Sequence, residues 1–458
     1  METENKSQFN RRDFLKLGVT AGVGAAVAGL ASQGCQTAEK KLSTQPGLPK
    51  VPPIDPVRIG FIGVGHRGAG HVRNFLKLQG VQIKAICDIV PEKVARMQKW
   101  VVDAGFPKPA AYTRGEHDYE RMCQEADLDL VIIATPWGWH VPMAVAAMKN
   151  GKHAATEVPA ATTLEGAWEL VETAEKNQRH CVMLENCNYG RREMMVLNMI
   201  RQGVFGDIIH GAAGYIHDLR QHKLSGYYEG EWRVKYSIRY NGNLYPTHGL
   251  GPIANDMGIN RGDRFDYIVS MSSLSRGLHA YALEKYGPES KYSKMKFALG
   301  DVNVSLIKTV KGLTITLYHD TNLPTPYSRI DMVQGTKAAS IGYPDRIYIE
   351  GRSPHHQWEP LEKYREEFDH PLWQKLESLA KGSGHGGMDF LEIYRLIEAL
   401  RTGTPTDMDV YDAAALSSVV ELSERSVAHK SRPVDFPDFT RGFWKERPPL
   451  TIPGPTTV

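Results

Sequence analysis

The chain has 458 residues, of which 41% are hydrophobic and 23% are charged. These proportions exclude a wholly disordered or collagen-like protein, and the length predicts two domains in a soluble globular protein. The chain carries 55 lysine and arginine residues against 52 aspartate and glutamate residues, which gives a net charge of +3. Because no broad basic surface is available to hold a phosphate backbone, we expect a small-molecule partner and no nucleic acid.

Cysteine and histidine spacing does not indicate a metal site. The five cysteines form no C-x-x-C pair, which argues against a structural zinc site and against a disulfide framework. Two pairs of histidines, His66 with His71 and His140 with His153, also lack the spacing of metal ligands. We therefore expect no metal. The cysteines are Cys35, Cys87, Cys123, Cys181 and Cys187.

Residues 1–35 predict an export signal. Arg11 and Arg12 precede an apolar run over 17–30, which is shorter than the roughly 20 residues of a membrane span. Paired arginines in this position are typical of the twin-arginine pathway, so we expect a periplasmic protein without a membrane span in the mature chain. Cys35 is a candidate for lipid attachment, which leaves soluble and lipid-anchored forms open. The proline-rich stretch 36–56 reads as a linker.

Residues 57–186 predict a Rossmann domain. Five short apolar runs alternate with amphipathic stretches such as 91–104 and 164–177, which predict helices. Near-continuous apolar runs are typical of parallel strands that are buried on both faces, so the pattern predicts a doubly wound parallel sheet in an α/β protein. The expected strands are Val57–Val64, Gln82–Asp88, Leu128–Thr135, His153–Thr156 and Cys181–Asn186.

The pattern changes in residues 187–440. After an expected helix over 191–202, five longer strands follow with no crossover helices between them, which predicts an α/β domain with an open, largely antiparallel sheet. Late helices are expected at 388–402 and 410–429, and residues 441–458 read as a surface arm. The expected strands are Ile208–Asp218, Ile268–Leu274, Asp301–Thr309, Leu313–Asp320 and Ile330–Gln334.

A glycine-rich turn follows the first expected strand. Gly63, Gly65 and Gly68 have the G-x-G-x-x-G spacing that lets a pyrophosphate approach the N-terminus of a helix, and His66 and Arg67 lie within the turn. The turn stands between a strand and a helix, where this motif is informative. We therefore expect a dinucleotide site.

Asp88 indicates which dinucleotide binds. It lies 20 residues after Gly68, at the end of the second expected strand, where a carboxylate accepts hydrogen bonds from ribose hydroxyls. The 2′-phosphate of NADP would face this charge, and residues 89–91 supply no arginine to pair with it. The predicted cofactor is NAD.

Two further strand ends should face the same crevice, because ligands of parallel sheets bind at the carboxyl ends of strands. One strand end offers aromatic faces and an imidazole, and the next places a carboxylate near the nicotinamide ribose. The expected cofactor contacts at these ends are Trp137, Gly138, Trp139, His140, Glu157 and Val158.

These elements together resemble the Gfo/Idh/MocA oxidoreductase family, and the resemblance covers almost everything after the leader. Four segments resemble glycoside hydrolase family 109, which comprises α-N-acetylgalactosaminidases that keep NAD bound. They read EVPAATTLEGAWELVE, ENCNYGRREMMVLNMIRQGVFGDIIH, YPTHGLGP and MGINRGDRFDYIVSMSSLSRG.

Two departures separate the chain from the family's dehydrogenases. Val158 stands where the common motif has an acid-base lysine, and Leu244 stands where an aspartate precedes His248 by four residues. Both departures resemble the glycosidase branch and weaken the interpretation as an inositol or sugar dehydrogenase.

The resemblance also implies a mechanism. Ordinary glycosidases use two carboxylates beside the scissile bond, and the sequence offers no convincing pair. The resemblance implies instead that bound NAD oxidises C3 of a terminal α-linked N-acetylgalactosamine, the aglycone leaves by elimination, water adds, and the hydride returns. Such chemistry needs a base and donors for a developing oxyanion.

The resemblance carries these roles onto particular residues. His248 is the expected base, because imidazole titrates near working pH, and Tyr189 and Tyr327 are the other expected catalytic residues. Asn186, Trp232 and Tyr245 are carried over as further cofactor contacts. The expected substrate contacts are Tyr215, Arg233, Tyr245, Pro246, Thr247, His248 and Tyr327.

Two other functions stay open at this stage. A net sugar oxidoreductase or epimerase would share the fold, and a sensor would bind NAD without changing a sugar. Fold analogy alone does not decide the substrate, and a homo-oligomer also stays open.

Overall fold

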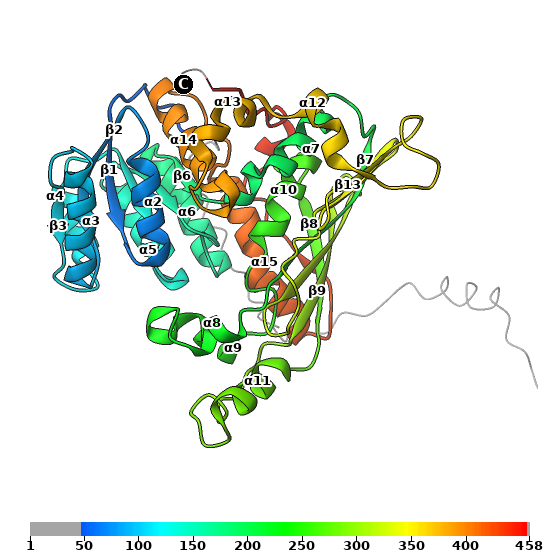
Figure 1. Ribbon diagram of the computed structural model, residues 1–458, viewed down its shortest axis with the longest axis horizontal. Helices are drawn as coiled ribbons and strands as arrows, with labels where there is room; N and C mark the ends of the chain where they lie inside the picture. The colour runs from blue at the N-terminus through cyan, green and yellow to red at the C-terminus, as the bar shows by residue number, and fades with distance from the viewer. Residues whose placement is uncertain (1–46, 456–458) are drawn as a thin grey trace, which may run out of the picture. The chain divides into compact units, whose positions relative to one another are not determined.

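The computed structural model describes residues 47–455 (Figure 1). The expected export signal, Cys35 and the first part of the expected linker lie outside the described residues. Within 47–455, none of the helices has the length and apolar character that crossing a membrane requires.

The first sheet has six parallel strands in the order β3-β2-β1-β4-β5-β6. The strand order reverses between β1 and β4, which is where ligands of such sheets bind. The predicted doubly wound sheet is confirmed, but β3 was missed because it has three residues, of which Ala110 and Ala111 are exposed. The strands are β1 Val57–Ile62, β2 Val81–Cys87, β3 Ala110–Tyr112, β4 Leu130–Ile133, β5 His153–Thr156 and β6 Cys181–Met183.

Helices cover both faces of this sheet and begin where the sequence signals a start. Pro91 occupies the first turn of α3, and the side chain of Thr163 caps α6 by accepting a hydrogen bond from the Gly166 N–H at 3.1 Å. The helices are α2 His66–Phe75, α3 Pro91–Asp103, α4 Asp118–Glu125, α5 His140–Lys149 and α6 Leu164–Asn177.

The second sheet has nine strands in the order β14-β13-β12-β11-β7-β10-β9-β8-β15. It is largely antiparallel, as predicted, although β7 and β10 pair in parallel. The strands are β7 Ile208–Ile216, β8 Phe265–Ser272, β9 Val302–Thr309, β10 Thr314–Asp320, β11 Met332–Gly335, β12 Ala338–Ile341, β13 Arg346–Ile349, β14 Glu359–Pro360 and β15 Val434–Asp435.

The expectation of no crossover helices between these strands is wrong. Three helices separate β7 from β8, namely α8 Arg220–Leu224, α9 Trp232–Arg239 and α10 Thr247–Met257, and α11 Gly277–Tyr286 separates β8 from β9. Helix α10 contains Gly249 and Pro252, whose types favour a loop when the sequence is read alone. Tertiary packing overrides this preference. Helix α10 packs so closely on β7 that a Cβ on Gly249 would lie 2.5 Å from the backbone of Gly214, so this position requires glycine.

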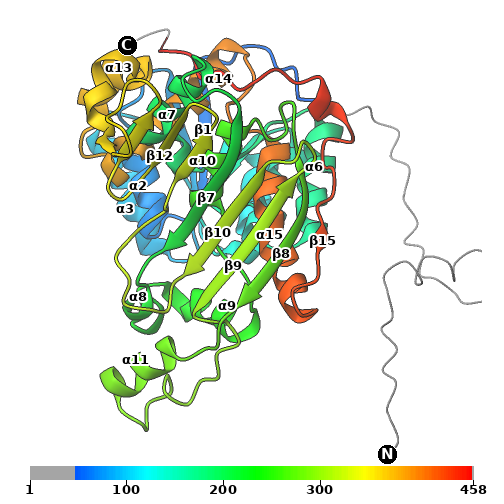
Figure 2. The same cartoon turned by 90° about the vertical axis from the view of Figure 1, so that its right-hand side faces the viewer.

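The remaining helices are α7 Arg191–Arg201, α12 Arg365–Phe368, α13 Pro371–Ala380, α14 Met388–Thr402 and α15 Val410–Ala428. Helices α10 and α15 lie behind the second sheet in the view of Figure 2, which looks onto the opposite face of that sheet. This opposite face carries exposed apolar side chains, among them Met271 and Leu306.

Both ends of the described chain pack against the body. The Gly47 N–H donates to the Tyr411 hydroxyl at 3.1 Å, so this part of the expected linker is anchored. The expected surface arm is corrected as well, because Leu450 and Ile452 are buried in the core. The carbonyl of Ile452 lies 3.0 Å from His370 Nε2.

Candidate functional site

Each glycine of the turn after β1 has a distinct steric role. Gly63 has a φ of +80°, and a Cβ on Gly68 would lie 1.9 Å from the Gly63 carbonyl oxygen. A Cβ on Gly65 would have only Lys93 Nζ nearby, at 3.9 Å. Gly63 and Gly68 therefore serve the turn itself, whereas Gly65 leaves open space at the N-terminus of α2. The turn fits a dinucleotide.

Asp88 is hydrogen-bonded to the glycine turn and to the segment that follows β2. Its Oδ2 accepts a hydrogen bond from the Val64 N–H at 2.8 Å, and its Oδ1 accepts one from the Val90 N–H at 2.9 Å. Each carboxylate oxygen can accept a further bond, so Asp88 keeps capacity for ribose hydroxyls. The residues of this turn thus suit the predicted cofactor.

Arg67 lies in the turn and is held by two carboxylates. Its Nε lies 2.6 Å from Glu157 Oε1, and its Nη1 lies 2.5 Å from Asp389 Oδ2. His71 Nε2 also lies 2.6 Å from Glu157 Oε1. Burial alone would raise the pKa of Glu157, but the charge of Arg67 and the hydrogen bond from His71 lower it to about 2. The expected contact of Glu157 with the cofactor stays a prediction.

The polar segment after β4 divides into two parts. Trp137 is buried and stacks on Tyr245, with 5.7 Å between ring centroids, and meets Trp232 edge-on at 5.1 Å. Trp139 instead contacts His117 at 5.7 Å between centroids. These contacts join Trp137, but not Trp139, to the second domain's aromatic residues.

His140 does not point into open space. Its two ring nitrogens lie 2.8 Å from the carbonyl oxygens of Thr135 and Pro159, and the side chain is fully buried. It therefore joins the loops after β4 and β5. Gly138 lies between the two tryptophans, where a Cβ would approach the Tyr236 hydroxyl to 3.4 Å. Val158 is buried beside Pro159.

Four predicted residues come together as an aromatic cluster, which we define as Tyr215, Tyr245, His248 and Tyr327. Ring centroids lie 4.6 Å apart for Tyr215 and Tyr245, 4.9 Å for Tyr245 and His248, and 6.2 Å for Tyr215 and Tyr327. The residues come from β7, from α10 and the segment before it, and from the loop after β10. Burial raises the pKa of the Tyr215 and Tyr245 phenols, so both stay protonated donors.

Arg233 lies against this cluster. Its guanidinium is 4.8 Å from the Tyr245 ring centroid and 5.0 Å from that of Trp137, and Nη1 donates to the Tyr228 hydroxyl at 2.8 Å. Aromatic faces stabilise the buried charge. Within residues 47–455 no carboxylate forms an ion pair with Arg233, so its charge is available to a ligand.

A cavity beside Tyr215 and Tyr245 contains side chains that the sequence analysis did not single out. Lys223 donates to Thr321 Oγ1 at 2.7 Å and to Asn322 Oδ1 at 2.8 Å, and burial together with Arg233 lowers its pKa to about 7. Three buried polar atoms in the wall have no hydrogen-bond partner among the described residues, and these are Arg233 Nε, Ser237 Oγ and His319 Nδ1. Such atoms are available to a bound polar molecule.

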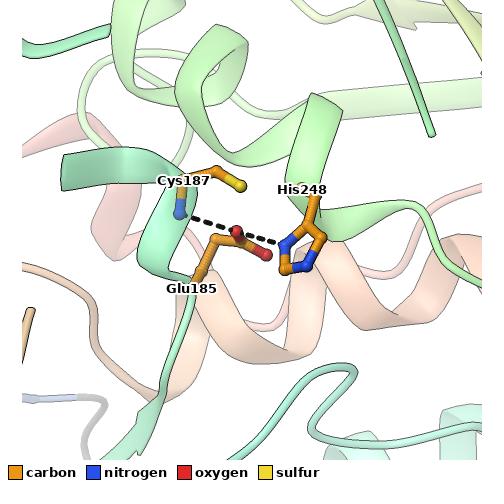
Figure 3. Close-up of side chains that lie close together, drawn as sticks. All are labelled: Glu185, Cys187 and His248. Carbon is orange, nitrogen blue, oxygen red and sulfur yellow. Dashed lines mark hydrogen bonds and ion pairs between the residues drawn. The ribbon is translucent and has the colours of Figure 1, made fainter. Parts of the chain in front are cut away.

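His248 is hydrogen-bonded to a carboxylate that the sequence analysis missed. Its Nδ1 lies 2.7 Å from Glu185 Oε1, which also accepts from the Cys187 N–H at 3.1 Å (Figure 3). Burial would raise the pKa of Glu185, but the interaction with His248 and the hydrogen bond from the Cys187 N–H lower it, so the carboxyl group is ionised. Glu185 directly precedes Asn186 at the end of the first sheet, and that position was the available signal.

Glu185, Cys187 and His248 are also the one group of potential metal ligands in the described part of the chain, with ligating atoms within 4.8 Å of one another. Arg329 Nη1 lies 2.6 Å from Cys187 Sγ, which places a positive charge beside the group. This charge opposes a cation, and the hydrogen bond to His248 already engages Glu185.

Tyr189 lies outside the aromatic cluster. Its hydroxyl donates to Asp407 Oδ2 at 3.2 Å, in a buried pocket that also contains Glu392 and Thr406. Asn186 Nδ2 donates to Asp389 Oδ1 at 2.6 Å. The predicted catalytic role of Tyr189 therefore has no support from its position.

Pro246 and Thr247 are buried where α10 begins, next to His248. Thr247 Oγ1 has no hydrogen-bond partner among residues 47–455. His66 is exposed at the glycine turn, with its ring 5.3 Å from that of Tyr227. A segment of the second domain thus reaches the dinucleotide turn.

Two family profiles match the chain. "Oxidoreductase family, NAD-binding Rossmann fold" matches residues 57–185, and "Glycosyl hydrolase 109, C-terminal domain" matches residues 189–446. A Glycosyl hydrolase family 109 protein of Solibacter usitatus is 50% identical over 96% of this chain and 99% of its own. One of Shewanella pealeana is 47% identical over 98% of this chain and 100% of its own.

Solved structures share the fold at low identity. Levoglucosan dehydrogenase in complex with NADH and levoglucosan is 19% identical, with a TM-score of 0.65 over 83% of this chain and 99% of its own. WlbA dehydrogenase from Bordetella pertussis, in complex with NADH and UDP-GlcNAcA, is 17% identical, with a TM-score of 0.56 over the same shares. The match of residues 57–185 to the NAD-binding profile confirms the predicted cofactor, NAD.

Proposed function

This chain belongs to glycosyl hydrolase family 109, and from that membership we propose that it hydrolyses terminal α-linked N-acetylgalactosamine of glycans. The family and the NAD-binding fold make it an NAD-dependent enzyme of the glycosidase type. The substrate and the chemical route are our proposal.

The observation that carries the proposal is the meeting of the two domains' predicted residues. Trp137, at the end of β4, stacks on Tyr245, whose ring contacts His248. Residues predicted to contact the cofactor and residues predicted to contact the substrate therefore lie side by side, which supports the proposal. Bound NAD would supply a hydride acceptor and donor for C3 of the sugar.

The side chains of this chain would do the remaining work. His248 would take the proton of the C3 hydroxyl, and the phenols of Tyr215 and Tyr245 would donate hydrogen bonds to the oxyanion that develops after oxidation. Arg233, whose charge no carboxylate of the described chain neutralises, would add electrostatic stabilisation at the same place.

A net sugar oxidoreductase or epimerase is the alternative. The solved neighbours include dehydrogenases, but identities of 17–19% support the shared fold alone. The two functions differ in redox balance, because a glycosidase of this kind regains its cofactor in every turnover, whereas a dehydrogenase consumes it.

The test follows p-nitrophenol release from p-nitrophenyl α-N-acetylgalactosaminide by the purified mature chain, with no cofactor added. We expect many turnovers per enzyme molecule without accumulation of reduced-nicotinamide absorbance. Absence of release, together with net reduction of added NAD by free sugars, would overturn the proposal in favour of the dehydrogenase.

We also propose that residues 1–35 direct export through the twin-arginine pathway. Cell fractionation should find the mature enzyme in the periplasm. Replacing Arg11 and Arg12 with lysine should retain the precursor in the cytoplasm, and unchanged periplasmic delivery would contradict the assignment.

A further inference from the structure

We propose that Glu185 is a positioning residue that holds His248 in the tautomer with a free Nε2, and that this nitrogen acts as the base. The inference rests on the proposed function for the role of His248. It adds a residue that neither the sequence analysis nor the family comparison assigns.

Glu185 is hydrogen-bonded directly to His248, and its side chain is held in place by burial and by a second hydrogen bond. Glu185 Oε1 lies 2.7 Å from His248 Nδ1, and the Glu185 side chain is 0% exposed. The same oxygen accepts the Cys187 N–H at 3.1 Å and thereby caps the short 3-10 helix Asn186–Tyr189. A buried side chain that is bonded both to its own backbone turn and to the imidazole has little freedom to rotate.

The protonation pattern follows from this geometry. An ionised carboxylate can only accept hydrogen bonds, so Nδ1 must carry the hydrogen of the neutral imidazole. Nε2 then has a lone pair and no hydrogen. The carboxylate also stabilises the imidazolium that forms when Nε2 takes a proton, as the acid of a Ser-His-Asp triad does.

The proton balance of the step is simple. The O–H bond of the sugar hydroxyl breaks, its proton binds Nε2, and its electron pair stays on the sugar oxygen. His248 gains one positive charge beside the negative charge of Glu185, so the pair becomes neutral overall. No further reactant is required for the transfer.

Other groups around His248 do not compete with Glu185 for Nδ1. The neighbouring rings belong to Tyr215 and Tyr245, and burial keeps these phenols protonated. Burial also raises the pKa of the Cys187 thiol, which leaves it neutral. His217, which directly follows β7, is hydrogen-bonded to the Tyr215 hydroxyl, with 3.0 Å between Nδ1 and the hydroxyl oxygen. Glu185 is the one carboxylate among the described residues that is hydrogen-bonded to His248.

The kinetic test uses Glu185→Gln, which keeps the shape of the side chain and removes its charge. We expect kcat for the p-nitrophenyl substrate to fall about 100-fold, the lower range for a general-base step, with KM and bound NAD unchanged. The acid limb of the kcat–pH profile should move to lower pH, because the carboxylate no longer stabilises the imidazolium. Glu185→Asp should recover part of kcat.

The matched control is Glu175→Gln. Glu175 is 4% exposed and hydrogen-bonded to Tyr411 and Arg441, and it has no contact with the aromatic cluster. Neutralising this carboxylate should leave kcat and the pH profile as in the wild type. A Glu185→Gln enzyme that matches this control in both readouts would overturn the proposal.

A second measurement does not depend on turnover. NMR of the ¹⁵N-histidine-labelled wild-type holoenzyme, assigned with His248→Gln, should find the His248 hydrogen on Nδ1. A hydrogen on Nε2 would overturn the proposal even if Glu185 variants failed to fold. If the wild type releases no p-nitrophenol, the proposed function fails, and the NMR result still decides whether Glu185 sets the tautomer.

Discussion

Arg67 and Glu157 join the glycine turn to the end of β5, with 2.6 Å between Arg67 Nε and Glu157 Oε1. The turn and the strand end that should surround the cofactor are therefore linked by the protein's own side chains. Asp389 on α14 holds the other side of the same guanidinium at 2.5 Å. A residue late in the chain thus helps to shape the dinucleotide site.

We expect Glu157→Gln to weaken NAD retention and to destabilise the protein. Arg67 keeps Asp389, so the loss should not exceed about 3 kcal/mol, the low end for breaking a buried ion pair. Urea unfolding and the NAD content after gel filtration measure the two effects. The exposed Glu169→Gln on α6 is the control and should change neither.

The pH dependence of this ion pair has a defined sign. The pKa of Glu157 is lowered from 4.5 to about 2, so its contribution is fully present above pH 4.5 and is lost as the pH falls towards 2. The difference in unfolding free energy between wild type and Glu157→Gln should therefore be the same at pH 7 and pH 5. If this difference in unfolding free energy disappeared by pH 5, the lowered pKa of Glu157 would be contradicted.

The dinucleotide side of the site was predictable because its rules are local. A glycine turn after a strand and a carboxylate at the next strand end, here Gly63 to Gly68 and Asp88, meet in every sheet of this topology. Trp137 was predictable for the same reason, since parallel strands bring their carboxyl ends to one edge. The strand β3 was missed because three residues carry too little pattern.

The substrate side depends on long-range packing that a sequence pattern does not contain. Helix α10 carries His248, and it lies on β7 because Gly249 permits close approach to Gly214. Lys223 and His319 line one cavity although they lie 96 positions apart along the chain. Their proximity follows from the contact of α8 with the segment after β10, where Lys223 donates to Thr321 and Asn322, and neither residue type alone indicates a site.

Two of the turn glycines, Gly65 and Gly68, provide a matched pair of substitutions. Gly65→Ala should fold with a wild-type Tm, because its Cβ meets only Lys93 Nζ at 3.9 Å, but it should bind NAD weakly, since the methyl group occupies the space a pyrophosphate needs. Gly68→Ala should lower the Tm, because its Cβ would lie 1.9 Å from the Gly63 carbonyl oxygen.

Differential scanning fluorimetry and NAD content separate the two effects. Full NAD occupancy in Gly65→Ala would show that the cofactor does not approach this part of the turn. A wild-type Tm for Gly68→Ala would contradict the close packing of turn and helix.

His248→Ala should retain NAD and lose hydrolysis by about 100-fold or more, the usual scale for a general base. The side chain is 14% exposed and touches the site rather than the core, so we expect the fold to persist. Bound NAD and the initial rate of p-nitrophenol release are the two readouts. A rate equal to that of the wild type would remove His248 from the mechanism.

Lys223 gives the protein a specific pH dependence of stability. Its pKa falls from 10.5 to about 7 in the folded protein, so between these values the unfolded chain holds a proton that the folded chain has lost. Unfolding then takes up a proton, and stability rises with pH across this window. The cost of burying Lys223 is greatest below pH 7 and disappears above pH 10.5.

Lys223→Met removes this titration and keeps a side chain of similar length. We expect the variant to gain stability relative to the wild type by about 2–3 kcal/mol more at pH 6.5 than at pH 9, since each pKa unit is worth about 1.4 kcal/mol. The loss of the hydrogen bonds to Thr321 and Asn322 lowers stability at both pH values and cancels in this comparison. Guanidinium unfolding at the two pH values measures the difference in unfolding free energy between variant and wild type. The exposed Lys296→Met is the control. Equal differences at pH 6.5 and pH 9 would mean that Lys223 keeps its proton in the folded protein, and that the cavity beside Tyr215 holds a full positive charge.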